Sequence, residues 1–155
     1  MKLYCVRHGE AVNAFENPER PLTLQGKEDI KILARSLASH GVQINHLIHS
    51  RRLRASQTAE ILADALKPQK ITEAKTGFDE NDSIEDALEM IQHWQDDTML
   101  VGHMPFMSHL VSALVVKNAH QTLVNYRPGT VVILEYSAGE GCWMIGGVVS
   151  PSMIR

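Results

Sequence analysis

The sequence has few of the residues that characterise several classes of protein. Its only cysteines, Cys5 and Cys142, are too few for a disulfide framework, and both lie in apolar runs where buried thiols are expected. Aromatic residues make up 5% of the chain, which disfavours stacking on nucleic-acid bases. No apolar run approaches the roughly 18 residues of a membrane span. Because Arg7 and His8 follow so soon after Met1, we also expect no signal peptide.

Charge of either sign is not in excess. Fifteen basic and eighteen acidic residues give a net charge of −3, which provides no general attraction to nucleic acid or to an anionic membrane. Hydrophobic residues at 44% and charged residues at 21% are ordinary for a globular protein. A chain of 155 residues is long enough to bury a core and fits one domain. We therefore expect a single domain over residues 1–155, cytoplasmic, with neither a nucleic-acid nor a membrane partner.

Short apolar runs alternate with longer segments of helical period. The pattern predicts strands at residues 3–6, 46–49, 70–73 and 99–101, and a closing hairpin of residues 130–136 and 143–149. It predicts helices at residues 24–40, 55–66, 84–91 and 106–115, with Asp82 or Ser83 as the cap of the third. Strands that alternate with helices indicate an α/β fold of three layers, in which a mostly parallel central sheet has helices on both faces.

Arginines and histidines follow three of the predicted strands. Arg7-His8-Gly9-Glu10 comes after the first strand, Ser50-Arg51-Arg52-Leu53-Arg54 after the second, and Gly102-His103-Met104-Pro105 after the strand at 99–101. The carboxyl ends of parallel strands lie along one edge of the sheet, where open α/β folds bind ligands. We therefore expect these side chains to converge although they are far apart in the sequence.

A pocket of arginine and histidine suits a phosphoryl group. Guanidinium groups bind phosphate oxygens in pairs and stay charged at every working pH. A neutral histidine can attack phosphorus through one ring nitrogen if a carbonyl holds the other as a donor, and a second, protonated histidine can stabilise the charge on the oxygens. Gly9 and Gly102 would let the backbone approach the ligand. We expect no metal and no cofactor, because neighbouring arginines would repel a cation.

At these residues the chain resembles the histidine phosphatase superfamily, which has the phosphoglycerate-mutase-like fold. Arg7-His8-Gly9-Glu10 is similar to its first signature, residues 50–59 to its second, and Val101-Gly102-His103-Met104-Pro105 to its third. The order and spacing match along essentially the whole chain. The segment Arg20-Pro21-Leu22-Thr23-Leu24-Gln25-Gly26 and the small size look most like the SixA-type phosphohistidine phosphatases.

The resemblance implies a role for each matching residue. It implies that His8 is the phosphorylated nucleophile and that the phosphate pocket is lined by Arg7, Arg54 and His103. We add Gly9 and Arg20 as substrate-binding residues. Arg51 and Arg52 are candidates for the rim of the pocket, and so is His49.

The general acid of larger relatives has no identifiable counterpart. Only the stretch from Ile71 to Ser83 is available for it, and its four candidates are Glu73, Asp79, Glu80 and Asp82. Asn13 lies one position before the place where mutase-type relatives carry an asparagine, which argues against mutase activity.

Three functions remain open at this point. The first is hydrolysis of phosphohistidine on a protein, such as a signalling protein, and the second is hydrolysis of a small phosphate monoester. The third is a catalytically silent module that binds phosphate or a partner protein. An imidazole leaves phosphorus far more readily than an alkoxide does, so a chain without an assignable acid favours the first.

Overall fold

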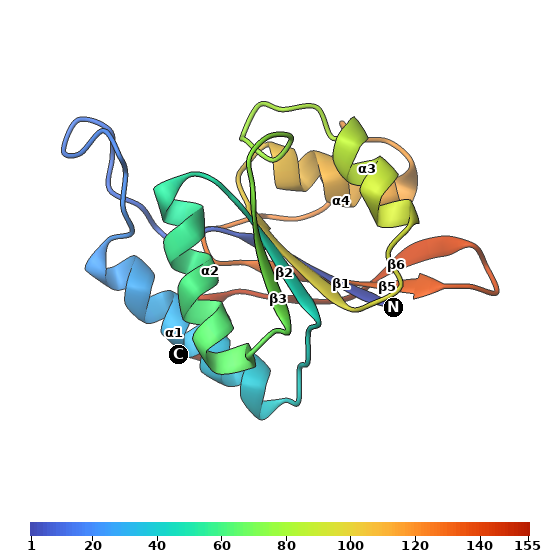
Figure 1. The fold of residues 1–155 in the computed structure, drawn as a ribbon, viewed down its shortest axis with the longest axis horizontal. Helices are drawn as coiled ribbons and strands as arrows, with labels where there is room; N and C mark the ends of the chain where they lie inside the picture. Colours follow the sequence, from blue (N-terminus) through green and yellow to red (C-terminus); the bar gives the residue numbers. More distant parts are fainter.

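The structure is a computed structural model that describes residues 1–155. A central sheet of six strands, in the order β3-β2-β4-β1-β5-β6, lies between two groups of helices (Figure 1). The strands are β1 (Lys2–Arg7), β2 (His46–Ser50), β3 (Lys70–Ala74), β4 (Thr98–Gly102), β5 (Val131–Ser137) and β6 (Cys142–Val149). The helices are α1 (Leu24–Ser39), α2 (Leu53–Leu66), α3 (Glu85–Gln92), α4 (Phe106–Val116) and α5 (Pro151–Ile154).

Four neighbouring strands of the sheet are parallel. β3 pairs with β2, β2 with β4, and β4 with β1 in this orientation, whereas β5 runs antiparallel to β1 and β6 antiparallel to β5. The predicted hairpin is therefore present at the C-terminal end of the chain. The mostly parallel α/β sheet expected from the alternation of strands and helices is confirmed.

Alternate residues of each inner strand supply two separate cores. In β1, Leu3 and Cys5 pack with α3 and α4, whereas Tyr4 and Val6 pack with α1 and α2 on the opposite face. Every residue of β4 is buried, as expected of a strand covered on both sides. The three-layer arrangement follows directly from this division.

Two helix starts and one short helix differ from the sequence-based expectation. Helix α2 begins at Leu53, two residues earlier than its apolar period indicates. Helix α3 has Ile84 as its N-cap residue, with the hydroxyl of Ser83 accepting a 3.2 Å hydrogen bond from the amide of Glu85. Asp82 instead turns its carboxylate toward the amide of Asp79, at 2.9 Å. The short helix α5 was not predicted, because four residues are too few to show a helical period.

None of the helices combines the length and the apolar character that crossing a membrane requires.

The loop that leaves β1 rests on the start of α1. The carbonyl oxygen of Glu10 accepts a 3.0 Å hydrogen bond from the amide of Thr23, whose hydroxyl caps α1 by accepting from Gly26 at 2.9 Å. A Cβ atom on Gly26 would overlap that same carbonyl oxygen. Position 26 therefore requires glycine, because the backbone of Glu10 packs directly against it. This contact between Glu10 and the start of α1 fixes the path of the chain just after His8.

Replacing Gly26 with alanine should destabilise the protein. In an ordinary helix the change favours folding by about 1 kcal/mol, but the clash with Glu10 should reverse the sign and lower the free energy of unfolding by about 1–3 kcal/mol. Urea unfolding measures the difference. Gly139→Ala is the matched control, because nothing lies within 4 Å of its Cβ position, and it should change stability by no more than about 0.5 kcal/mol. Equal stability of the two variants would contradict the packing argument.

Candidate active site

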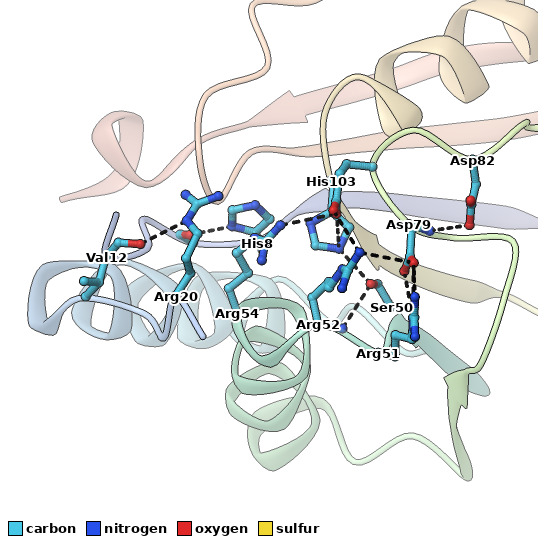
Figure 2. Close-up of polar contacts among 12 residues, drawn as sticks. His8, Val12, Arg20, Ser50, Arg51, Arg52, Arg54, Asp79, Asp82 and His103 are labelled. Atoms are coloured by element: carbon cyan, nitrogen blue, oxygen red, sulfur yellow. Dashed lines mark hydrogen bonds and ion pairs between the residues drawn. The ribbon is translucent and has the colours of Figure 1, made fainter. Parts of the chain in front are cut away.

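Two histidines meet where β1 and β4 end side by side. Arg7 lies opposite Gly102 in the parallel register, so His8 and His103 are the next residues of the two strands. The amide of His8 donates a 3.0 Å hydrogen bond to the carbonyl of Gly102. The two imidazole rings lie 5.1 Å apart, centre to centre, at an angle of 61°. Figure 2 shows both rings facing the arginines of α2 and its preceding turn.

The ring of His8 is held in one tautomer. Its Nδ1 lies 2.7 Å from the carbonyl oxygen of Gly9, which can only accept, so Nδ1 carries the hydrogen. Nε2 makes no hydrogen bond within the chain. Burial lowers the pKa of His8 to about 3, and the charges of His103, Arg54 and Arg7 act in the same direction. At neutral pH the ring is therefore uncharged, with a lone pair on Nε2.

Gly9 is fixed by α1 and α2. Its amide donates to the hydroxyl of Thr58 at 3.0 Å, and that hydroxyl donates to the carbonyl of Arg54 at 2.8 Å. A Cβ on Gly9 would lie 2.8 Å from Cγ1 of Ile30. Packing against α1 therefore gives one physical reason for glycine at this position, and the approach of the Gly9 backbone to a ligand stays a prediction.

Gly102 has a similar explanation. A Cβ at this position would lie 3.1 Å from Cε of Met107 in α4. This glycine too has a packing reason beneath the site, and its proximity to a ligand stays a prediction.

His103 is almost completely buried, with 1% of its surface exposed. Its Nε2 lies 2.7 Å from the hydroxyl of Ser50, which also accepts a 3.3 Å hydrogen bond from the amide of Arg52. Burial lowers the pKa of His103 to about 4, and the charge of Arg54 adds to the effect. The protonated second histidine expected from the sequence is therefore neutral in this structure. Ser50 belongs to the second signature, and the sequence did not predict a role for it. Its place at the end of β2 is the signal that indicates a position in the site.

A carboxylate lies among the cations of the site. Nη2 of Arg54, in the first turn of α2, is 3.2 Å from Oε2 of Glu80, and Nε2 of His103 is 3.5 Å from the same oxygen. Nη2 of Arg52 lies 3.3 Å from Oε1. Among the four acidic candidates, Glu80 alone contacts both Arg54 and His103.

Arg7 is positioned from an unexpected part of the chain. Its Nη1 donates a 2.7 Å hydrogen bond to the carbonyl of Tyr126, whose hydroxyl in turn donates to the carbonyl of Cys5. Burial lowers the pKa of Arg7, and so does the nearby charge of Arg20. Tyr126 lies in the loop between α4 and β5, where no periodic pattern exists that could have indicated its role.

The site opens into a pocket of about 540 Å³ that is rich in arginine. Arg20 reaches it from the loop after β1, with its Nε donating a 3.0 Å hydrogen bond to the carbonyl of Val12. Arg51 and Arg52 line the same pocket, as expected of rim residues. Arg51 forms two hydrogen bonds with Oδ2 of Asp79, at 2.8 Å from Nη2 and 3.1 Å from Nε.

Two other candidates lie away from this pocket. Nδ1 of His49 lies 2.9 Å from the carbonyl oxygen of Ser50, and its side chain lines a different hollow beside Ser56 and Glu60. Glu73 is exposed on the edge strand β3. His49 was therefore wrongly included among the candidates for the rim.

Comparison with known proteins gives a consistent result. The profile of the histidine phosphatase superfamily (branch 1) matches residues 3–85. Over 150 residues the chain is 26% identical to the phosphohistidine phosphatase SixA of Escherichia coli, covering 94% of this chain and 93% of that protein. An uncharacterised protein of Picosynechococcus sp. is 34% identical over 122 residues, which are 74% of this chain and 73% of that protein.

A solved structure has the same fold. The protein histidine phosphatase SixA complexed with tungstate superposes with a TM-score of 0.87 at 22% identity, and the match covers 100% of both chains. The phosphoglycerate-mutase-like fold expected from the sequence is confirmed. Since the family profile also spans more than half of its residues, the chain belongs to the histidine phosphatase superfamily (branch 1), and its class of activity is that of a phosphatase.

Proposed function

We propose that this phosphatase hydrolyses phosphohistidine on a protein, through a phosphoryl group carried on His8 and without a metal ion. The observation that carries the proposal is the state of His8. Its ring is neutral, Nδ1 is occupied by the carbonyl of Gly9, and Nε2 is left with a lone pair beside Arg7, Arg54 and His103. A module that only bound phosphate would not need a nucleophile prepared in this way.

The reaction has two displacement steps. First, Nε2 of His8 attacks the phosphorus of a substrate phosphohistidine whose ring carries a proton on its other nitrogen. The bond from phosphorus to the substrate ring breaks, its electron pair stays on that ring nitrogen, and a neutral imidazole departs. Water then attacks the phosphoryl group on His8, releases inorganic phosphate and restores the lone pair of Nε2. The hydrogen bond from Nδ1 to Gly9 stabilises the positive charge that the ring acquires while it carries the phosphoryl group.

The charge on the phosphoryl oxygens is stabilised by side chains instead of a metal. Arg7 and Arg54 supply fixed positive charges, and both have a buried Nε without a partner in the chain. His103 is neutral in the structure, but a phosphoryl dianion beside it would favour the protonated form. Together these groups act on the oxygens as charge spreads in the transition state.

A phosphohistidine substrate agrees with the similar proteins and with the chemistry. The similar protein of Escherichia coli is named a phosphohistidine phosphatase, and the similar structure was determined with tungstate, a tetrahedral oxyanion like phosphate. Phosphorus–nitrogen cleavage needs little help from an acid. The open, arginine-lined pocket also leaves room for a side chain presented by another protein.

The alternative substrate is a small phosphate monoester. One observation favours it: Glu80 lies beside Arg54 and His103, where a carboxyl group could protonate a departing oxygen.

We expect a phosphoenzyme that depends on His8. Protein mixed with labelled phosphohistidine substrate and quenched should carry acid-labile, base-stable phosphate, and His8→Ala should carry none. Excess chelator should change neither the labelling nor the turnover. His93→Ala is the control, since His93 is exposed outside the site. Label on the His8 variant, or activity that returns only with added metal, would refute the mechanism.

Arg54→Ala should weaken substrate binding. The loss of charge-assisted hydrogen bonds to the phosphoryl group should cost about 1.5–3 kcal/mol in binding, and more if the contact tightens in the transition state. Steady-state kinetics should show a higher KM and a lower kcat. Arg35→Ala removes the same charge from the exposed face of α1 and should have wild-type kinetics. Equal kinetics for Arg54→Ala and Arg35→Ala would show that Arg54 does not bind the phosphoryl group of the substrate.

A comparison of substrates with different leaving groups, an imidazole or an alkoxide, tests the substrate class. Phosphohistidine should be hydrolysed much faster than an alkyl phosphate, and neutralising Glu73, Asp79, Glu80 and Asp82 one at a time should leave most of the initial rate with phosphohistidine intact. Glu80→Gln is the decisive variant because of its contacts. A variant that abolishes phosphohistidine hydrolysis would identify a required acid, and efficient hydrolysis of the alkyl phosphate would favour the monoester alternative.

A further inference from the structure

Glu80 contacts the groups that a phosphoryl group on His8 would need. Its Oε2 lies 3.2 Å from Nη2 of Arg54 and 3.5 Å from Nε2 of His103, and its Oε1 lies 3.3 Å from Nη2 of Arg52. Arg54 is deeply placed, with 10% of its side chain exposed. The carboxylate therefore already balances part of the positive charge of the pocket.

A carboxylate and a phosphoryl group cannot share these contacts. Both present oxygen atoms that only accept hydrogen bonds, and both are anionic. Two anions side by side among buried groups repel each other strongly because little water screens them. Binding of a phosphoryl group to Arg54 and His103 thus requires the carboxylate of Glu80 to move away from at least one of them.

The local structure allows the side chain to move while the loop stays in place. The neighbouring Asp79 is tied to Arg51 by two hydrogen bonds of 2.8 and 3.1 Å, and its amide donates to Asp82 at 2.9 Å. The Glu80 side chain itself is 27% exposed on the solvent side of the site. Because the side chain is partly exposed, rotation about its own bonds is the movement that we expect to carry the carboxylate outward.

We propose that Glu80 is a displaceable internal ligand of the phosphate pocket, which competes with the phosphoryl group for Arg54 and His103. The inference rests on the proposed function only in placing the phosphoryl group at those two residues. Competition weakens the binding of free phosphate and of other small oxyanions. A protein substrate overcomes it through additional contacts with the arginine-lined rim, whereas the released phosphate has no such contacts and dissociates.

Oxyanion affinity tests the proposal directly. The dissociation constants of tungstate and inorganic phosphate are measured by calorimetry at pH 7.5 for the wild type, Glu80→Gln and Glu80→Ala. Loss of the competing charge should tighten both constants by about tenfold, the factor that corresponds to one charge-assisted hydrogen bond. Glu19→Gln is the matched control: Glu19 lines the same pocket but forms no ion pair, so the variant has the same net charge and should bind almost as the wild type does.

Unchanged or weaker oxyanion binding by both Glu80 variants would overturn the proposal, because it would show that the carboxylate does not compete. Equal tightening in Glu19→Gln would also overturn it, by assigning the effect to net charge. Melting temperatures identify any variant that fails to fold, and the two replacements of Glu80 differ enough for one to serve if the other fails.

A second measurement needs no variant. A crystal structure of the wild-type protein with tungstate should show the carboxylate of Glu80 more than 4 Å from Nη2 of Arg54 or from Nε2 of His103, and retention of both contacts would contradict displacement. These tests measure binding and geometry without turnover. Their failure is therefore distinguishable from failure of the His8 mechanism, which would appear as phosphoenzyme labelling of His8→Ala.

Discussion

The alignment of three parallel strands is the constraint on which the site depends. Arg7 lies opposite Gly102 across β1 and β4, and His49 lies opposite Val101 across β2 and β4, so all three strands end in the same row of the sheet. A shift of one residue in any pairing would turn the side chains to the opposite face. Such a slip is prevented because alternate residues of these strands enter two different cores. The packing of the sheet therefore sets the separation of His8 and His103.

Burial at that edge determines the chemistry. The same desolvation that lowers the pKa of His8 to about 3 keeps its ring neutral, and so able to attack phosphorus, beside arginines that remain charged. Buried positive charge without a counter-ion is costly. Glu80 supplies that counter-ion at 3.2 Å from Arg54. A neutral histidine, a cluster of cations and a neighbouring anion are thus consequences of one physical condition, the exclusion of water from the strand ends.

Periodic features of the sequence predicted most of the fold. The alternation of strands and helices gave the sheet, the closing hairpin and the edge at which Arg7, His8, Arg54 and His103 converge. Contacts made by irregular segments could not be predicted. Tyr126 holds Arg7 through a backbone carbonyl, which any residue possesses, so its side-chain type carries no signal. The packing of Gly9 against α1 and of Gly102 against α4 also needed coordinates, because a glycine that packs against a helix has no distinguishing mark in the sequence.

The same limit applies to the three acidic candidates that lie in the loop between β3 and α3, namely Asp79, Glu80 and Asp82. They differ in role only because the loop turns Asp79 toward Arg51, Asp82 toward the amide of Asp79, and Glu80 toward Arg54. No hydrophobic period specifies those directions.

The position of Glu80 also bears on the choice between substrates. In an in-line displacement the leaving group departs opposite the nucleophile, whereas arginine and histidine side chains bind the three oxygens around the phosphorus. Glu80 contacts Arg54 and His103, which are groups of the second kind. A carboxyl group that protonates a departing oxygen has to lie opposite His8 across the phosphorus, which is a different requirement from competing for Arg54 and His103. An imidazole leaving group requires no such second position, and displacement of Glu80 by the phosphoryl group is then the only movement that the reaction demands of it.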